Sequence, residues 1–313
     1  MKAKSYKKQF YVLLVMAAVL FFIVMNTDSS KEPPGFHQPS HQVTFLISEK
    51  MNIANENMKK GADTAANDFD VSLHFLIPDQ GTSISDLLKE AKDKGSEAVI
   101  IAPKEPIEVD SLLTCKNLLF AGARQAIAKR VPYIGVNYHN AGGAIADEII
   151  RHGNYHKKIY IVEHTAENDS IQELLRVMKS ELAKADNTVE LITGDTTVQI
   201  RNLLKREPDA VLVALDHKQM VKTAMLIENN SNGKPELYGI GNSRELIPYI
   251  ESGIITSTLV QDDFSIGYQA VECAVKQLNH ETCSDIDTIR YSLIDRENIY
   301  SKEHEKLMFP FTR

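Results

Sequence analysis

From residue 42 onward, short apolar runs alternate with longer stretches in which apolar residues recur every three or four positions. Runs of about four to eight apolar residues are typical of buried strands, whereas the longer period indicates a helix with one buried face. The pattern predicts strands at residues 43–48, 71–77, 98–102, 132–136, 158–163, 189–193, 210–215, 236–240 and 257–261. It predicts helices at residues 55–67, 84–94, 112–129, 142–151, 170–184, 198–205, 218–229, 244–251 and 266–278. This alternation indicates parallel sheets covered by helices.

The number of predicted strand and helix pairs exceeds what one sheet comfortably holds, and a single core tends to divide above about 250 residues. The chain has 313 residues, of which 43% are hydrophobic, so it has enough apolar side chains for two cores. We therefore predict an α/β fold with two doubly wound parallel-sheet lobes. Ligands of such sheets bind at the carboxyl ends of the strands, where loops and helix N-termini converge.

The residues that directly follow the predicted strands are almost all polar. Tyr138, Asp216 and Asn242 lie in these loops and are candidates for contacts with a ligand. Each also has a purely structural interpretation, because polar residues are common in loops. Asp216 in particular precedes a predicted helix, where an aspartate is favoured as the N-cap.

The N-terminus carries four lysines in its first eight residues, followed by an uncharged apolar run at residues 10–25. A run of this length lies between a long signal-peptide core and a short membrane span. We expect a retained transmembrane anchor behind a basic cytoplasmic tail at residues 1–9, with a cleaved signal peptide as the alternative. Residues 26–41 are polar and rich in proline, which is typical of a flexible stalk. The expected location is therefore the cell membrane, single-pass, with the C-terminal domain outside the cytoplasm.

The net charge of −7 argues against nucleic acid as a partner, because a nucleic-acid-binding domain needs a basic surface. The three cysteines, Cys115, Cys273 and Cys283, are too few and too scattered for a disulfide framework or a zinc site. A single bridge between Cys273 and Cys283 remains an open alternative. We predict no metal and no cofactor.

The sequence lacks the common catalytic signatures, including Gly-x-Ser-x-Gly, His-Glu-x-x-His, Cys-x-x-Cys and the phosphate-binding loop. Gly239 and Gly241 follow a predicted strand, but the third glycine of a dinucleotide site is absent. His152 and His156 lie four residues apart with Gly153 between them, and we interpret them as surface residues at a helix end. We therefore predict that the protein is not an enzyme and has no catalytic residues.

Five segments carry a resemblance to the type I periplasmic sugar-binding proteins, the ribose-binding-protein and LacI-like group. The last one, at residues 238–275, has the strand, glycine, helix, strand, glutamine and Gly-Tyr order of that family. Residues 61–66 resemble its first helix and residues 97–103 its third strand. Residues 131–137 resemble its Ile-Pro-Val-Val-x-x-Asp element and residues 137–142 its Asp-Asn-x-x-Ala-Gly element. These two elements are separate strands in the family and are fused here, so one strand of the first lobe is expected to be missing.

The resemblance also implies where the lobes and the ligand lie. The whole domain is expected at residues 42–298, with lobe 1 at 42–137 and 262–281 and lobe 2 at 138–261. A segment at about 285–298 would cross the hinge, and residues 299–313 would form a tail. Family members hold a sugar between aromatic rings and a ring of Asp, Asn, Arg and Gln side chains. Of these positions, the ones that keep suitable chemistry are Asn52, Asn137 (in place of Asp) and Gln261.

Other family positions have lost that chemistry: the resemblance places Ala54 and Asn55 at the aromatic pair, and Leu174, Leu215 and Gly241 at polar contacts. We therefore do not predict tight binding of a pentose or hexose. The predicted function is a solute-binding protein that closes on a small polar, carbohydrate-like ligand and passes the ligand or a signal to a membrane partner. That partner would be an ABC-type sugar permease or a sensor histidine kinase. The alternative is an adaptor with a degenerate cleft that binds a protein and no small molecule.

Overall fold

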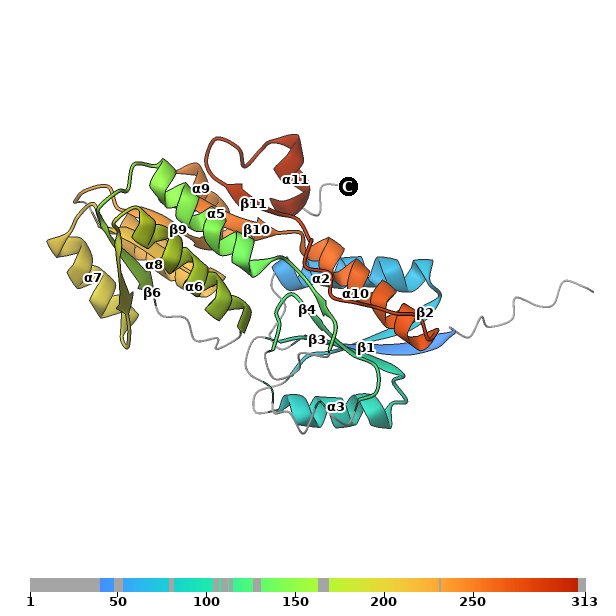
Figure 1. Cartoon of the computed structure of the whole chain (residues 1–313). Helices are drawn as coiled ribbons and strands as arrows, with labels where there is room; N and C mark the ends of the chain where they lie inside the picture. Colours follow the sequence, from blue (N-terminus) through green and yellow to red (C-terminus); the bar gives the residue numbers. More distant parts are fainter. Residues whose placement is uncertain are drawn as a thin grey trace, which may run out of the picture. The chain divides into compact units, whose positions relative to one another are not determined.

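The computed structural model describes residues 40–47, 53–78, 82–103, 107, 112, 115–125, 131–162, 169–230 and 232–308 (Figure 1). The chain divides into two units, Met1–Pro39 and Ser40–Arg313, and the second unit holds every described residue. Its strands form two sheets, each covered by helices on both faces. The predicted α/β fold of two parallel-sheet lobes is therefore confirmed.

The first sheet, in its described part, has five parallel strands in the order β2-β1-β3-β4-β5. They are β1 (His41–Ile47), β2 (Val71–Leu76), β3 (Ala98–Ala102), β4 (Leu118–Ala121) and β5 (Tyr133–Ile134). Helices α2 (Ile53–Asp68) and α10 (Asp263–Leu278) share a core with one face, and α3 (Ile84–Asp93) packs on the other (Figure 1). Because the inner strands are covered on both faces, they are continuous apolar runs instead of alternating ones.

The second sheet has six strands in the order β11-β10-β9-β8-β6-β7, and β11 alone of these runs antiparallel to its neighbour. They are β6 (Lys158–Val162), β7 (Thr188–Ile192), β8 (Val211–Ala214), β9 (Glu236–Ile240), β10 (Ser257–Gln261) and β11 (Tyr291–Ile294). Helices α5 (Tyr138–Arg151) and α6 (Asp169–Lys184) pack on one face. The other face is covered by α7 (Thr196–Arg206), α8 (His217–Glu228), η2 (Arg244–Leu246), α9 (Ile247–Glu251) and α11 (Lys302–Met308).

The chain passes between the two sheets three times: after β5, after β10, and between α10 and β11. The crossing segments are hydrogen-bonded to one another. Gly135 N–H donates to the carbonyl oxygen of Ile286 at 2.8 Å, and Asp262 N–H donates to that of Arg290 at 2.9 Å. These backbone bonds bring the three crossings together beside the carboxyl ends of β5 and β10.

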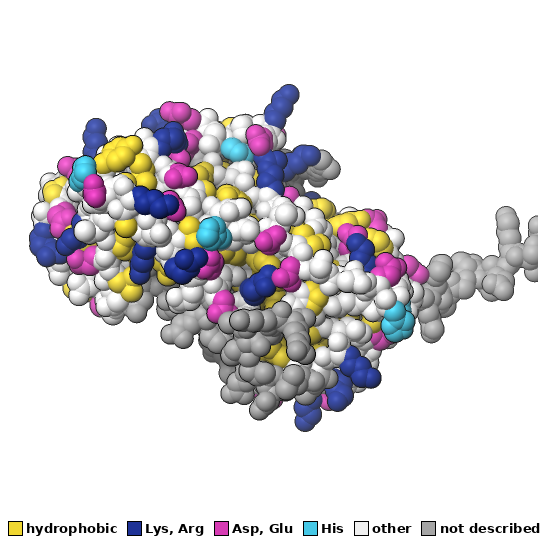
Figure 2. Space-filling view, viewed as in Figure 1, with side chains coloured by type: hydrophobic (Ala, Val, Ile, Leu, Met, Phe, Trp, Pro, Cys, Tyr) yellow, Lys and Arg dark blue, Asp and Glu magenta, His cyan; other side chains and the backbone are white. Residues whose placement is uncertain are grey.

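Charged side chains of both signs are mixed over the visible face of the described residues (Figure 2). Many form ion pairs on the surface, such as Lys158 with Glu190 at 2.9 Å. Exposed pairs of this kind contribute little to stability, about 0–1 kcal/mol each. The hydrophobic clusters on the two faces of each sheet therefore carry the fold.

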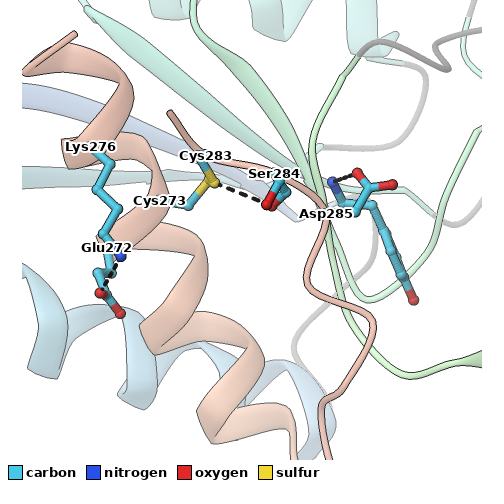
Figure 3. The surroundings of a disulfide bond; sticks show 7 residues. Glu272, Cys273, Lys276, Cys283, Ser284 and Asp285 are labelled. Atoms are coloured by element: carbon cyan, nitrogen blue, oxygen red, sulfur yellow. Dashed lines mark hydrogen bonds and ion pairs between the residues drawn. A yellow bond between two sulfur atoms is a disulfide. The ribbon is translucent and has the colours of Figure 1, made fainter. Parts of the chain in front are cut away.

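Cys273 and Cys283, for which a bridge was left open above, form a disulfide with their Cα atoms 5.6 Å apart (Figure 3). It ties α10 to the segment that leads into the third crossing. Two residues further on, the Asp285 carboxylate accepts a hydrogen bond from the backbone N–H of Tyr133 at 3.0 Å. Closing a loop of 10 residues stabilises a protein by about 2–3 kcal/mol in the chain-entropy model.

The predicted helix at residues 112–129 is wrong over its middle, which forms strand β4. Leu118–Ala121 is fully buried and pairs in parallel with both β3 and β5. A run of four apolar residues has too little periodicity to distinguish a strand from a helix, and burial in the sheet decides between them. The strand expected to be missing is therefore present: β4 and β5 are separate. Strand β5 is shorter than the predicted 132–136.

The expected location as a single-pass membrane protein is corrected by the structure. Among the residues it describes, no helix is long and apolar enough to cross a membrane. The predicted tail at residues 1–9 and anchor at 10–25 lie outside the described residues. So does the stalk at 26–41, except that Ser40 forms a bend and His41 already begins β1. At the other end, the residues expected to form a C-terminal tail include helix α11.

Candidate functional site

A cavity of about 610 Å³, lined mostly by polar residues, lies where the end of β4, the start of α5, the first turns of α6 and the third crossing meet. This volume is within the usual range of small-molecule sites, about 300–1,000 Å³. Its lining residues are Arg124, Tyr133, Val136, Asn137, Tyr138, His139, Asp169, Ser170, Gln172, Glu173, Arg176 and Asp287. Both sheets contribute, because Arg124 follows a strand of the first and α6 belongs to the second. The cavity therefore has the position that ligand sites of parallel sheets take.

Two hydrogen bonds join the lobes at this cavity. The backbone N–H of Arg124 donates to Ser170 Oγ, on the first turn of α6, at 2.9 Å. The hydroxyl of Tyr138, the first residue of α5, donates to the carbonyl oxygen of Gly122 at 2.8 Å. Burial raises the pKa of Tyr138 above its usual range, so the hydroxyl keeps the proton that it donates.

Arg124 is a residue of the cavity that the sequence did not reveal, because it fell within the wrongly predicted helix. Its guanidinium lies 4.9 Å from the ring centre of Tyr133 and donates to Asp285 Oδ2 at 2.6 Å. A guanidinium carries five donors, so one ion pair leaves N–H groups for a ligand. The signal available in the sequence was Gly122 directly after an apolar run, which is typical of a strand end; in the structure this glycine has a positive φ.

Asn137 forms the N-cap of α5: its side-chain oxygen accepts a hydrogen bond from Asn140 N–H at 3.0 Å. Its Nδ2 donates to Asp287 Oδ2 in the third crossing at 3.0 Å. One amide group thus starts a helix of the second lobe and contacts a crossing segment. A change in the angle between the lobes would therefore alter the surroundings of Asn137.

A second polar group lies at the carboxyl ends of β9 and β10, around Asp263 on the first turn of α10. Asp263 is only 2% exposed. It accepts hydrogen bonds from Gln261 Nε2 at 2.8 Å and from Asn242 Nδ2 at 3.4 Å. Burial raises the pKa of Asp263 to about 7, against the lowering effect of these two bonds. Burial and, after it, the charge of Asp263 raise the pKa of Tyr138, which lines the cavity.

Residues 44–282 match a family model described as a periplasmic binding protein domain. The chain belongs to the periplasmic binding protein family. Solved structures of similar fold include an ABC transporter solute-binding protein of Agrobacterium vitis with bound D-fucose. It is 16% identical, with a TM-score of 0.75, over 86% of this chain and 100% of that one.

Two further solved structures of similar fold are of sugar-binding proteins. The glucose-galactose binding protein GanP of Geobacillus stearothermophilus is 18% identical over 83% of this chain and 99% of that one, with a TM-score of 0.73. A solute-binding protein of Burkholderia graminis in complex with D-arabinose is 19% identical over 84% and 98%, also with a TM-score of 0.73. At sequence identities this low, the similarity shows only that the proteins share a fold. No curated protein sequence matches the chain.

Of the six residues predicted for the site of this periplasmic binding protein, four lie in two pairs, one caps a helix and one is outside the described residues. Asn137 and Tyr138 lie together in the cavity, and Asn242 and Gln261 lie together at Asp263. Asp216 is the N-cap of α8 and accepts a hydrogen bond from Gln219 N–H at 2.9 Å. Asn52 lies outside the described residues. Two of the positions where family chemistry was lost, Leu174 and Leu215, are buried in the core of the second lobe and do not line the cavity.

Asn242 has an additional partner that the sequence did not suggest. Its Nδ2 also donates, at 3.2 Å, to the carbonyl oxygen of Leu307 in α11. Its Oδ1 is buried and has no hydrogen-bond partner among the described residues. Helix α11 thus covers the carboxyl end of β9 in this binding protein.

The rim of the cavity carries ion pairs. Arg176 donates two hydrogen bonds to Glu173, at 2.7 and 2.8 Å, and His139 lies 2.9 Å from the same carboxylate. The bonds from Arg176, and then that from His139, lower the pKa of Glu173 to about 2. This carboxylate therefore stays ionised at any physiological pH, and its charge is largely balanced by its partners.

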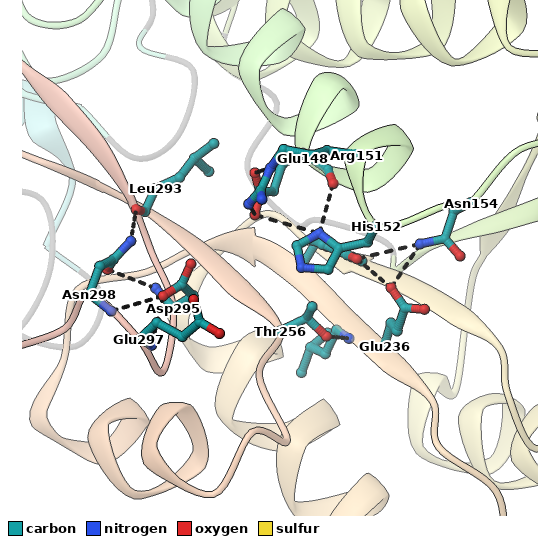
Figure 4. A network of polar contacts seen from close by, with 12 residues as sticks. Glu148, Arg151, His152, Asn154, Glu236, Thr256, Leu293, Asp295, Glu297 and Asn298 are labelled. Carbon is teal, nitrogen blue, oxygen red and sulfur yellow. Dashed lines mark hydrogen bonds and ion pairs between the residues drawn. The ribbon is translucent and has the colours of Figure 1, made fainter.

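A separate network of polar residues lies near the start of β9 (Figure 4). Glu148, 6% exposed, accepts from Arg151 at 2.6 Å, and Asn154 donates to Glu236 Oε2 at 2.7 Å. His152 and His156 are both exposed, as expected for surface residues near a helix end, and the His152 ring also lies edge-on against Tyr238. This network is at the amino end of the strand, away from the ligand edge, so we assign it a structural role. Among the described residues no group of three or more His, Cys, Asp or Glu could hold a metal ion.

Proposed function

We propose that this periplasmic binding protein binds a small, polar, carbohydrate-like ligand in the cavity between its lobes and delivers it to an ABC-type membrane transporter. The observation that carries the proposal is the cavity itself, which collects Arg124, Asn137 and Tyr138 at the carboxyl edge of the sheets. Arginine and amide groups offer the donors and acceptors that sugar hydroxyls require. Related folds bind D-fucose and D-arabinose, which supports this ligand class.

The charges at the cavity bear on the ligand class. Arg124 is paired with Asp285 and Arg176 is paired with Glu173, which favours a ligand without net charge.

Ligand binding would favour the closed arrangement of the lobes. A molecule in the cavity contacts Arg124 after β4 of the first lobe and Ser170 on α6 of the second. Only the closed form offers both sets of contacts, so its population rises with occupancy. A membrane partner would recognise that form. A permease fits the relatives described as transporter components, and a sensor kinase would use the same closure as its signal.

A second candidate function is an adaptor that binds a protein without a small molecule. The ion pairs Arg124–Asp285 and Arg176–Glu173 favour it, because they satisfy the cavity charges internally. A ligand would then have to compete with bonds that already exist.

A thermal-shift screen of the full-length protein against neutral monosaccharides, deoxy sugars and polyols separates the two functions. A ligand at 100 times its dissociation constant stabilises the folded state by about 2.7 kcal/mol. We expect Arg124→Ala to weaken binding of a hit about 10- to 100-fold, the value of a hydrogen bond to a charged group. Lys184→Ala removes an exposed lysine at the far end of α6 and should leave binding unchanged. No hit across the panel would favour the adaptor.

A further inference from the structure

A carboxylate of the third crossing, Asp287, lines the cavity together with Asn137. Asp287 lies between α10 and β11 and is half-buried. Its Oδ2 accepts a hydrogen bond from Nδ2 of Asn137, the N-cap of α5, at 3.0 Å. Two polar side chains on the cavity wall, one from the crossing and one from the start of a helix, are therefore in direct contact.

Backbone hydrogen bonds hold Asp287 in place. Gly135 N–H donates at 2.8 Å to the carbonyl oxygen of Ile286, the residue before it. Ile289 N–H, two residues after it, donates at 3.1 Å to the carbonyl oxygen of Gly135. Asn137 is held in turn because its side-chain oxygen caps α5. Side chains that are already fixed lose little conformational freedom when a ligand binds, so this pair is preorganised.

The hydrogen bond between Asn137 and Asp287 leaves further bonding capacity on both groups. An amide NH₂ has two hydrogens, so Asn137 keeps a second N–H after it donates to Asp287. A carboxylate accepts at two oxygens, with about four lone-pair positions in all, so one amide bond leaves Asp287 with acceptor positions. A donor and an acceptor thus lie side by side on the cavity wall, with Nδ2 and Oδ2 3.0 Å apart.

Glu173, another carboxylate of the cavity, is less suited to contact a ligand. Arg176 donates to both of its oxygens, and His139 lies 2.9 Å from one of them. A ligand hydroxyl would have to compete with these bonds. The bond that Asp287 accepts comes from a neutral amide at one oxygen, so a hydroxyl can donate to Asp287 without displacing that amide.

We propose that Asp287 and Asn137 together bind two hydroxyl groups on neighbouring carbon atoms of the ligand, with Asp287 as a specificity-determining residue. A hydroxyl both donates and accepts, so one hydroxyl donates to Asp287 while its neighbour accepts the second N–H of Asn137. Hydroxyls on neighbouring carbons lie close enough together to meet a donor and an acceptor that are themselves in contact. The ligand class is then a neutral compound with a 1,2-diol, an inference that rests on the proposed function.

The test is calorimetric titration of the full-length protein with the neutral monosaccharides of the screen, followed by monodeoxy analogues of each sugar that binds. D-fucose and D-arabinose, which proteins of similar fold bind, are among these probes. We expect Asp287→Asn to weaken binding of the parent sugar about 10-fold, because a hydrogen bond to a charged group is replaced by a neutral one. Asp186→Asn is the matched control: it removes an exposed carboxylate in the turn after α6 and should leave binding unchanged.

The deoxy analogues distinguish contact with the ligand from a general loss of structure. In the wild type, we expect one analogue to bind about 10- to 100-fold more weakly than the parent sugar, and the analogue at a neighbouring carbon about 2- to 10-fold more weakly. In Asp287→Asn the first of these factors should fall to about 2- to 10-fold, the value of a neutral hydrogen bond. Asn137→Ser, which keeps an oxygen for the N-cap, should reduce the second factor.

A sugar that binds Asp287→Asn as tightly as the wild type would overturn the inference and leave the proposed function standing. A wild-type series in which no two neighbouring hydroxyls contribute to affinity would do the same, and this result does not depend on the folding of any variant. Failure of every monosaccharide to bind the wild type would reject both the inference and the proposed function.

Discussion

Asp263 has a buried carboxyl group that, among the described residues, accepts side-chain hydrogen bonds from two neutral amides. Burial disfavours the charged form, and two amide bonds do not fully offset that effect, so the pKa rises to about 7. The residue was not singled out from the sequence, because an aspartate at the start of a helix is ordinarily a solvated cap. Asp262, its neighbour, does serve as the cap.

This raised pKa predicts a pH-dependent stability. The unfolded carboxyl has the ordinary pKa of about 3.8, so the folded protein binds the proton more tightly. The stabilising contribution is therefore complete below pH about 4 and is lost as the pH rises through 7. Asp263→Asn resembles the neutral acid but does not titrate. Between pH 5 and 8, we expect the free energy of unfolding of Asp263→Asn to rise relative to that of the wild type. A shift of three pKa units corresponds to a difference of up to about 4 kcal/mol.

Urea denaturation of both proteins at several pH values measures this difference. Asp262→Asn is the control and should show no comparable trend. A stability difference between Asp263→Asn and the wild type that is constant from pH 5 to 8 would contradict the raised pKa.

At the scale of single residues, the sequence located side chains that follow strands but not the partners that hold them. Tyr138 and Asn242 were identified because carboxyl ends of parallel strands meet at one edge, and Asn137 and Gln261 were identified through the family resemblance. Their partners Asp287, Gly122 and Asp263 were not, because these contacts join segments distant in the chain or depend on burial. Only the folded sheets bring such groups within bonding distance.

At the scale of elements, the packing of α2 against α10 depends on two glycines. A Cβ atom on Gly61 would collide with the carbonyl oxygen of Phe264, and one on Gly267 would collide with that of Met58. The glycines therefore let the two helix backbones approach closely. These helices come from opposite ends of the domain and cover one face of the first sheet (Figure 1).

We expect Gly267→Ala to destabilise the protein by about 1–3 kcal/mol or more, because the obstructing atoms are backbone atoms that cannot rotate away. Gly143→Ala is the matched control. It lies inside α5 with no atom within 4 Å of the added Cβ, so it should stabilise by about 0.5–1 kcal/mol. Chemical denaturation of both variants checks the pair. Equal effects of the two substitutions would show that the helices tolerate a wider spacing.

Most of the helices and strands could be predicted from periodicity, because the strands are apolar and polar residues begin the helices that follow. Strand β4 could not, since its four apolar residues lie within a longer stretch that satisfies a helical pattern as well. Pairing with β3 and β5 overrides that local preference. The error also hid Arg124, which follows β4 and lines the cavity.

At the scale of the whole molecule, the two lobes are joined by three crossings that are hydrogen-bonded together. Such a junction permits the lobes to change their angle while the crossings stay paired. Beside this junction, Arg124 of the first lobe donates a hydrogen bond to Ser170 of the second. Tyr138 of the second lobe donates one to Gly122 of the first. A ligand in the cavity would add contacts to both lobes and stabilise the closed form.

Hydrogen–deuterium exchange of the full-length protein, with and without a saturating sugar from the screen, tests this central claim most directly. We predict slower exchange in residues 122–125 of the first lobe and in residues 169–173 of the second, with the rest of α6 unchanged. Protection of both segments places the ligand between the lobes. Protection confined to one lobe, or no change in either segment despite bound sugar, would contradict a binding site in the cavity.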